Sequence, residues 1–294
     1  MIKQRLSPLD TIFTICNTLF MLFVCVVTVY PFVYILSTSL ASSNVPLTQI
    51  HIIPPEISLE SYRRVIANPL IGIGYLNTIL RTVLGTTLAV LVTLMLAYPL
   101  SKKYYPHRTF WTALVVFTMF FHGGLIPTYI LVRNLHLMNT IWALVLPELV
   151  GAFNLVIVRN YMMTIPESLE ESAKLDGAND IIILFRIVLP ICKPIIATIT
   201  LWIAVWHWNS WFDSMIYSTR AETQVVQLVM RRIVVEGTQN SASLYSQGNT
   251  RFEVVSPMNL KAATIMATTL PILVVYPFVQ KYFVKGVMVG SLKG

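Results

Sequence analysis

Charged residues are scarce in this sequence. Only 12% of its 294 residues are Asp, Glu, Lys or Arg, whereas 55% are hydrophobic. Soluble domains usually carry about a quarter charged residues, so this chain has too little polar surface to cover a soluble globule. Its composition therefore excludes a soluble globular domain and indicates an integral membrane protein.

Catalytic and nucleotide-binding signatures are also missing. Neither HExxH nor GxSxG occurs, which leaves no clustered catalytic set for a membrane-embedded enzyme. No lysine is followed by Ser or Thr, so the phosphate loop Gly-x4-Gly-Lys-Ser/Thr cannot occur. Any ATP that powers this protein must therefore be hydrolysed on another polypeptide.

Cysteine spacing and the distribution of basic residues exclude two further classes. Cys16, Cys25 and Cys192 lie in or beside apolar stretches, without the close spacing of a disulfide framework or a metal site. We interpret them as small core residues. The basic residues give a net charge of +8 but sit between apolar runs. They form no continuous basic face, which argues against nucleic-acid binding.

Six apolar segments account for most of the chain. A helix needs about 20 residues to span a bilayer. These runs are longer than barrel strands and do not alternate apolar with polar residues as such strands do. The first run is too long for a signal peptide, so we expect an uncleaved first helix. The prediction is one all-α transmembrane domain over residues 1–294, with helices at about 12–36, 71–100, 110–132, 135–158, 190–212 and 262–280. We expect Arg81, within the second of these helices, close to the outer interface.

Charge in the short connecting loops predicts the orientation. Lys102, Lys103 and Arg108 follow the second segment, whereas a lone Arg133 follows the third. Cytoplasmic loops carry the excess of Lys and Arg, so we expect both termini in the cytoplasm. Two longer polar segments then face opposite sides: 159–193 inside and 213–261 outside.

The inner segment carries a short amphipathic helix with signals at both ends. Thr164 with Glu167 fits a capping box, as does Ser168 with Glu171. Pro166 suits a first-turn position, Glu170 and Lys174 form a favourable i, i+4 pair, and Gly177 is placed to end the helix in a left-handed conformation.

Three roles suit this helix. It is a solvated connector, a helix lying in the membrane interface, or a docking element for another protein. Interface helices usually carry a Lys/Arg-rich polar face, whereas this one carries an excess of Glu and Asp. The acidic face favours docking over membrane anchoring.

The same segment matches a known spacing. Glu171-Ser172-Ala173 is followed after three residues by Gly177 and, after nine more, by Ile187-Val188-Leu189-Pro190. This pattern resembles the EAA loop of bacterial ABC importer permeases, with Ser172 replacing the usual Ala. The triplet Asp176-Gly177-Ala178 is similar to the sugar-importer version of the motif.

The resemblance extends over nearly the whole chain. The tail from Gln280 to Gly294 is similar to the C-terminus of the second permease of maltose-type carbohydrate importers. The run Trp208 to Asp213 looks like the branch associated with lipoprotein-type oligosaccharide-binding proteins. These features imply a type I ABC importer permease fold in a bacterial cell membrane, with a cytoplasmic coupling helix between helices four and five.

The resemblance implies which residues meet the ATPase. In this family the loop forms a coupling helix that sits in a cleft of the ATPase subunit, and the tail reaches into the same subunit. We expect Leu189-Pro190 and Pro194 to form a stiff elbow behind that helix, although an ordinary helix start is the alternative. The candidate coupling residues are Glu170, Glu171, Ser172, Ala173, Leu175, Asp176, Gly177, Ala178, Ile187, Leu189, Pro190, Lys293 and Gly294.

The candidate substrate path lies within the apolar segments. Glu148 is the one acidic residue well inside a predicted span, where ionisable groups are functional candidates by default. It lines the path or pairs within the bundle. Tryptophans near helix ends are either flat faces for sugar rings or interfacial anchors. The candidates are Glu148, Asn154, Trp206, Asn209, Trp211 and Asp213.

The outer segment is the candidate contact with a binding protein. In maltose-type importers this loop enters the binding protein, which places the contact at Gly237, Asn240, Gly248 and Asn249 here. Arg231, Arg232 and Arg251 lie in or beside it. They suit an acidic oligosaccharide, because Arg pairs bidentately with carboxylates, and equally the acidic surface of a binding protein.

The predicted function is half of the pore of an oligosaccharide importer. Its expected partners are a second permease, an ATPase dimer and an extracytoplasmic solute-binding protein. We expect no metal or cofactor on this chain, with ATP and Mg on the partner ATPase. A permease for a non-sugar solute and an ion-coupled secondary transporter remain the alternatives; a channel would need a repeated filter-like segment, which is not visible.

Overall fold

The computed structural model describes residues 8–42, 52–236 and 256–291. These residues are helical apart from loops and one isolated bridge between Ala41 and Ile57. The chain divides into two compact units. One comprises Met1–Asn68 and Arg232–Leu270, and the other comprises Pro69–Arg231 and Pro271–Gly294.

The first unit contains α1 (Pro8–Leu40), α2 (Glu60–Ala67), the π-helical η3 (Arg232–Glu236) and the beginning of α15 (Pro257–Ser291). Most of α1 exposes large apolar side chains, as a lipid-facing helix does. Its C-terminal end is held by polar contacts. The Ser39 and Tyr62 hydroxyls lie 2.7 Å apart, and the Asn259 amide donates to the Ala41 carbonyl at 2.8 Å.

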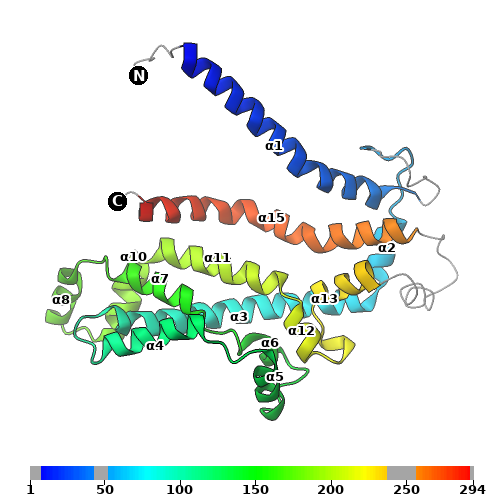
Figure 1. Ribbon diagram of the computed structural model, residues 1–294. Coiled ribbons are helices and arrows are strands. Elements are labelled where there is room, and N and C mark those ends of the chain that lie inside the picture. Colours follow the sequence, from blue (N-terminus) through cyan, green and yellow to red (C-terminus); the bar gives the residue numbers. More distant parts are fainter. Residues whose placement is uncertain (1–7, 43–51, 237–255, 292–294) are drawn as a thin grey trace. The chain divides into compact units, whose positions relative to one another are not determined.

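The second unit is organised around α3 (Pro69–Ser101). This helix packs along α11 (Lys193–Asn209), α7 (Ala152–Met162) and α13 (Val226–Arg231), as Figure 1 shows. Glycines permit close approach of helices within a membrane. A Cβ on Gly74 would lie 3.0 Å from the backbone of Val226, so α13 contacts the α3 backbone directly.

Two apolar cores hold this unit together. The larger joins α3, α7 and the segments that lead into α11, and its fully buried members include Ala97, Val158, Ile183, Val188 and Ile199. The smaller lies where α6 (Ile141–Val145) meets α12 (Phe212–Tyr217) and α13. The cores leave polar residues at both ends of α3, where the candidate sites lie.

Two of the described helices, α1 and α3, are each long and apolar enough to cross a membrane. They contain the predicted spans 12–36 and 71–100. Two pairs of consecutive helices, each bent at a short break, are also long and apolar enough if each pair counts as one crossing. These are α4 (Arg108–Phe120) with α5 (Leu125–Asn134), bent by 110°, and the segment Asp180–Ile191 with α11, bent by 83°.

The third predicted helix, 110–132, is wrong as a continuous element. The chain leaves the helix at Phe121 and re-enters at Leu125, and Gly124 has a φ of +87°. A positive φ is readily accessible only to a residue without a Cβ. The Gly123-Gly124 pair is therefore the sequence signal for the break.

The fourth predicted helix, 135–158, is also interrupted. Only α6 and α7 are helical there, and residues 146–151 between them are not. Pro147 has no backbone N–H to donate to a helix, and its ring crowds the preceding turn. Glu148 consequently lies in a break of the backbone rather than on a helix.

The predicted outer loop 213–261 begins with ordered structure. α12, the short 3₁₀ turn η2 (Ala221–Thr223) and α13 occupy its first part, and Val225 to Val229 are buried. The fifth predicted helix, 190–212, corresponds to α11, which ends at Asn209. The sixth, 262–280, lies within α15.

Asn139 fixes the loop between α5 and α6 against the loop that follows α12. Its backbone adopts a φ of +59°, which Asn tolerates better than most residues. Its side-chain oxygen accepts from the backbone N–H groups of Thr219 at 2.8 Å and Arg220 at 3.0 Å. This link positions the loops that border the cavity described below.

Two glycines of α3 should respond oppositely to alanine. A Cβ on Gly85 would overlap the His207 imidazole, whereas a Cβ on Gly72 meets nothing within 4 Å. Gly85→Ala should lower the free energy of unfolding by about 1–3 kcal/mol through overpacking. Gly72→Ala should raise it by up to about 1 kcal/mol through reduced backbone entropy. Thermal unfolding of the detergent-purified protein measures both, and equal shifts would contradict the close contact between α3 and α11.

Candidate functional site

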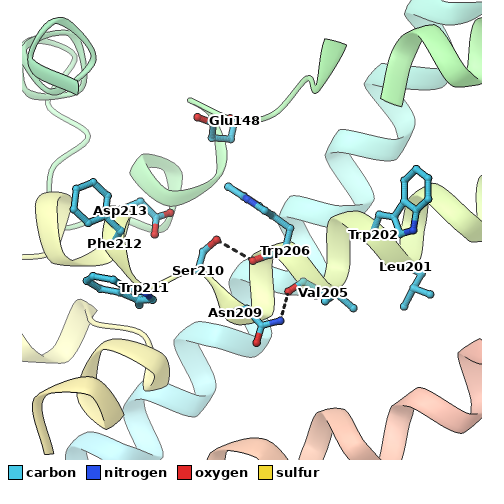
Figure 2. Close-up of a pocket in the computed structure, with 10 residues that line it drawn as sticks. All are labelled: Glu148, Leu201, Trp202, Val205, Trp206, Asn209, Ser210, Trp211, Phe212 and Asp213. Atoms are coloured by element: carbon cyan, nitrogen blue, oxygen red, sulfur yellow. Dashed lines mark hydrogen bonds between the residues drawn. The ribbon is translucent and has the colours of Figure 1, made fainter. Parts of the chain in front are cut away.

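A cavity of about 860 Å³ opens at the junction between α11 and α12. Figure 2 shows Glu148 on the facing loop and the side chains of the junction around it. Five of the six residues predicted for the substrate path line this cavity. They are Glu148, Trp206, Asn209, Trp211 and Asp213.

The sixth predicted residue, Asn154, lines a neighbouring cavity of about 260 Å³ together with Trp206 and His207. A third cavity, of about 710 Å³, extends toward Gly123 and Gly124 and includes Asp213. Glu148 borders all three cavities. The broken backbone therefore places one carboxylate where three hollows meet.

Aromatic rings dominate the cavity wall. Trp202, Trp206 and Trp211 all line it. Trp202 stacks on Phe153 with ring centroids 6.3 Å apart, and Trp206 meets the His207 ring edge-on at 4.9 Å. Flat apolar faces with few polar groups form the usual lining of a small-molecule site.

Two polar groups supplement these rings. The Asn209 amide nitrogen donates to the Val205 carbonyl at 2.9 Å, which uses its donor side and leaves its oxygen as an acceptor. Glu148 adds an exposed carboxylate. Acceptors beside aromatic faces suit a ligand that carries many hydroxyl groups.

Arg81 of α3 is a buried residue behind the cavity wall, and the sequence did not place it there. Its side chain is completely buried, and its guanidinium pairs through both terminal nitrogens with Asp213. The same group donates to the Ser210 carbonyl at 3.1 Å and to Nδ1 of His207 at 3.3 Å. It also lies 5.5 Å from the centre of the Trp206 ring.

The signal for Arg81 was present in the sequence. An arginine inside an apolar run is a functional candidate by default, but Arg81 was expected close to the outer interface. The structure instead satisfies its donors inside the protein. Asp213 therefore borders the cavity with its charge already compensated, and Glu148 is the cavity carboxylate without such a pair among the residues described.

The predicted coupling segment folds as α8 (Glu167–Leu175). Its end follows the prediction, because Gly177 has a φ of +82°. The Ala178 N–H donates to the Ala173 carbonyl at 2.9 Å and the Gly177 N–H to the Lys174 carbonyl at 3.0 Å. These two bonds form a Schellman motif, which satisfies carbonyls at a helix C-terminus.

The predicted start of α8 is wrong in detail. Pro166 occupies the N-cap position and no side chain caps the helix. The Thr164 hydroxyl donates back to the Tyr161 carbonyl instead of forming a capping box. The first-turn carboxylates are used for ion pairs with the loop after α3, which competes with capping.

The expected pair between Glu170 and Lys174 does not form. Glu170 turns inward, is only 7% exposed, and pairs with Lys102. Lys174 instead lies 3.5 Å from Asp180 and donates to the Tyr104 hydroxyl at 3.3 Å. That hydrogen bond is the main cause of the raised pKa of the Lys174 ammonium.

The outer edge of α8 carries a further ion pair. Lys103 and Glu167 lie 2.9 Å apart with both side chains largely exposed. The hydrogen bond from Lys103 lowers the pKa of the Glu167 carboxyl. The loop after α3 thus contacts α8 through one buried pair and one exposed pair.

One face of α8 remains available for a partner. Leu175 is 90% exposed, and Glu171, Ser172, Asp176 and Gly177 are also exposed. Ala173 is buried on the opposite face, and Ala178 packs against the larger core. Among the described residues, the inner face of the helix thus contacts the rest of this chain, whereas these outer residues are exposed.

The elbow behind α8 is confirmed as a bend. α9 (Asp180–Ile183), the π-helical η1 (Leu184–Val188) and α10 (Leu189–Ile191) lead to α11 at 83°. Ile187 and Leu189 pack against the larger core, whereas Pro190 is exposed. Pro190 cannot donate to the carbonyl four residues earlier, and wider π-type turns accommodate such a lost bond.

Some predicted residues lie outside the part of the chain that the structure describes. These are the candidate binding-protein contacts Gly237, Asn240, Gly248 and Asn249, and the candidate tail contacts Lys293 and Gly294. Among the described residues, no group of three or more His, Cys, Asp or Glu could hold a metal ion.

Comparison with known proteins identifies the class. Residues 108–289 match the family described as binding-protein-dependent transport system inner membrane component. The chain is 39% identical over 285 residues to protein LplC of Bacillus subtilis, which covers 96% of this chain and 95% of LplC. It is also 39% identical to the polygalacturonan/rhamnogalacturonan transport permease YtcP of the same organism, over 94% of this chain and 96% of YtcP.

A solved structure has the same fold. The chain resembles a subunit of a bacterial ABC transporter that imports the acidic polysaccharide alginate, with a TM-score of 0.87 and 32% identity. The match covers 94% of this chain and 98% of that one. The protein is thus a transmembrane subunit of an ABC importer, and it belongs to the binding-protein-dependent transport system inner membrane component family. Membership implies a partner ATPase and a solute-binding protein.

Removing the buried cation should destabilise the protein. Arg81→Met leaves Asp213 without its charge partner and should lower the free energy of unfolding by about 3 kcal/mol. Adding Asp213→Asn should recover part of that loss. The exposed Arg220 provides the control, since Arg220→Met should change stability by less than about 0.5 kcal/mol. Equal thermal midpoints for Arg81→Met and Arg220→Met would contradict the role given to the pair.

Proposed function

We propose that this chain forms half of the pore of an importer that carries an oligosaccharide, driven by ATP hydrolysis on a partner subunit. Family membership supports the importer assignment. The observation that supports a sugar is the cavity, which is lined by three tryptophans together with Glu148 and Asn209. The relative named for polygalacturonan/rhamnogalacturonan transport and the solved importer of alginate agree with this choice of solute.

The proposed assembly has four kinds of subunit. A second, different permease would complete the pore, an ATPase dimer would bind ATP and Mg, and a binding protein would deliver the sugar. This chain would bind no cofactor itself. Six crossings with both termini in the cytoplasm would place α8 on the ATPase side and the α11–α12 junction toward the outer half of the membrane.

The coupling role of α8 is supported by its two faces. Glu171, Ser172 and Leu175 are exposed on a short helix with a fixed end at Gly177. A rigid helix with an unused outer face is suited to fill a cleft in another subunit. Glu170 and Ala173 would transmit its movement to the rest of this chain, because both are buried on the inner face.

The substrate path would use Glu148 and Asn209 for hydrogen bonds, and Trp206 and Trp211 for stacking. Asn154 would contribute from the adjoining cavity. Asp213 would shape the wall rather than bind sugar, because its carboxylate is paired with Arg81. An ion-coupled transporter would need ionisable groups at membrane depth that can bind and release the coupling ion. Arg81 and Asp213 are paired with each other, and Glu148 gives little support for such a mechanism by itself.

Transport should depend on the ATPase and on the end of α8. In vesicles that contain the whole complex, uptake of a labelled oligosaccharide should stop when the ATPase or ATP is omitted. Gly177→Leu forces a side chain into a left-handed conformation that costs about 1–3 kcal/mol, and it should reduce uptake about tenfold.

Ser172→Ala is the matched control for that variant. Ser172 is exposed on α8, and the family pattern has Ala at this position. Its uptake should equal that of the parent complex. Uptake that continues with no nucleotide hydrolysed would contradict the importer proposal and favour a secondary transporter.

A further inference from the structure

The cytoplasmic end of α3 is tied to α8 through a buried ion pair. Lys102 follows the last residue of α3 and pairs with Glu170 on the inner face of α8. Their side chains are only 12% and 9% exposed. Lys102 also lies 4.7 Å from the centre of the Tyr98 ring, which belongs to α3 itself. Burial of both partners makes this contact far less replaceable by water than a surface pair.

The same helix carries the buried ion pair at the cavity. Arg81 of α3 holds Asp213, the Ser210 carbonyl and His207 at the α11–α12 junction. Arg81 lies 20 residues before Ser101, the last residue of α3. At about 1.5 Å per residue, the two pairs are separated by about 30 Å along the axis.

α3 is the unbroken route between these two places in its unit. It runs as one α-helix over 33 residues. The other described candidates bend or break: α4 and α5 meet at 110°, the segment before α11 is bent by 83°, and α6 and α7 are separated by a loop. A rigid helix transmits a displacement along its length, whereas a break can absorb it.

We propose that α3 is the rod that carries movement of α8 to the wall of the cavity, with Lys102–Glu170 and Arg81–Asp213 as its two positioning contacts. This inference rests on the importer function proposed above and adds a path within this chain. Displacing α8 would pull on Lys102 and shift α3 along or about its axis. Through Arg81, that shift would move the α11–α12 junction. The nucleotide would bind on the partner ATPase, since this chain has no phosphate-loop motif, so the pairs would act on coupling and not on hydrolysis.

Breaking the cytoplasmic pair should uncouple the complex. In vesicles with all subunits, Lys102→Met and Glu170→Gln should each lower the ratio of oligosaccharide transported to ATP hydrolysed by about fivefold, while ATP hydrolysis continues. Arg81→Met should lower the same ratio. The double variant Lys102→Met/Glu170→Gln leaves no lone buried charge but still lacks the pair, so its ratio should stay as low as that of the single variants.

The chain offers a matched control in Lys103 and Glu167. This pair joins the same loop to the same helix, but its side chains are 77% and 66% exposed. Lys103→Met and Glu167→Gln should leave the ratio unchanged. Parental ratios in Lys102→Met and Glu170→Gln complexes would overturn the inference. Because the parent complex would still need ATP, that result would leave the proposed function intact.

A cross-link provides a test that does not depend on the stability of the charge variants. Lys102→Cys and Glu170→Cys, in a complex whose three native cysteines are replaced by Ala, can be joined by a short flexible bifunctional thiol reagent. These substitutions remove the ion pair, so the uncross-linked complex should have the low transport-to-ATP ratio of the charge variants, and cross-linking should raise that ratio if α3 and α8 move as one body. Transport that is lost on cross-linking and restored by cleaving the link would show that the two must separate, and would overturn the inference.

Discussion

The ion pair between Arg81 and Asp213 constrains the arrangement of the second unit. A guanidinium inside an apolar helix is expensive unless its charge and its donors are met. Here Asp213, Ser210 and His207 meet them. Because all three come from the end of α11 and the start of α12, that junction must lie against α3. α3 and α11 therefore pack closely, and Gly85 of α3 leaves room for the His207 ring of α11.

This constraint explains why the cavity forms where it does. Irregular backbone at membrane depth is tolerated where it is buried in protein or lines a cavity. The break at Ser210 borders the first cavity, the breaks at Gly124 and Pro147 border the third, and Asp213 lines both. Asp213, paired with Arg81, helps to form the cavity wall, whereas Glu148 gives the cavity a negative charge. At the C-terminal end of α3, the buried Glu170 plays a part comparable to that of Asp213, since it fixes a neighbouring element to the helix through a single charge.

Much of this was predictable from the sequence, and the misses have two causes. Hydrophobic length predicted the spans within α1 and α3, and the motif spacing located α8 together with the left-handed Gly177. Length alone could not reveal the breaks at Gly124 and Pro147, because the flanking residues remain apolar. The partners of Glu170 and Arg81 are distant in sequence, so local rules favoured an i, i+4 pair for the first and an interfacial position for the second. Tertiary contacts decided both.

The central claim is that one continuous helix, held by a buried charge pair at its C-terminal end and by another about 30 Å along it, joins α8 to the cavity. Structures of the whole complex, determined with and without a non-hydrolysable ATP analogue, test it most directly. The account predicts that Lys102 stays paired with Glu170 and Arg81 with Asp213 in both states, while α8, α3 and the α11–α12 junction shift together. Separation of either pair in one state, or movement of α8 past a stationary α3, would contradict it.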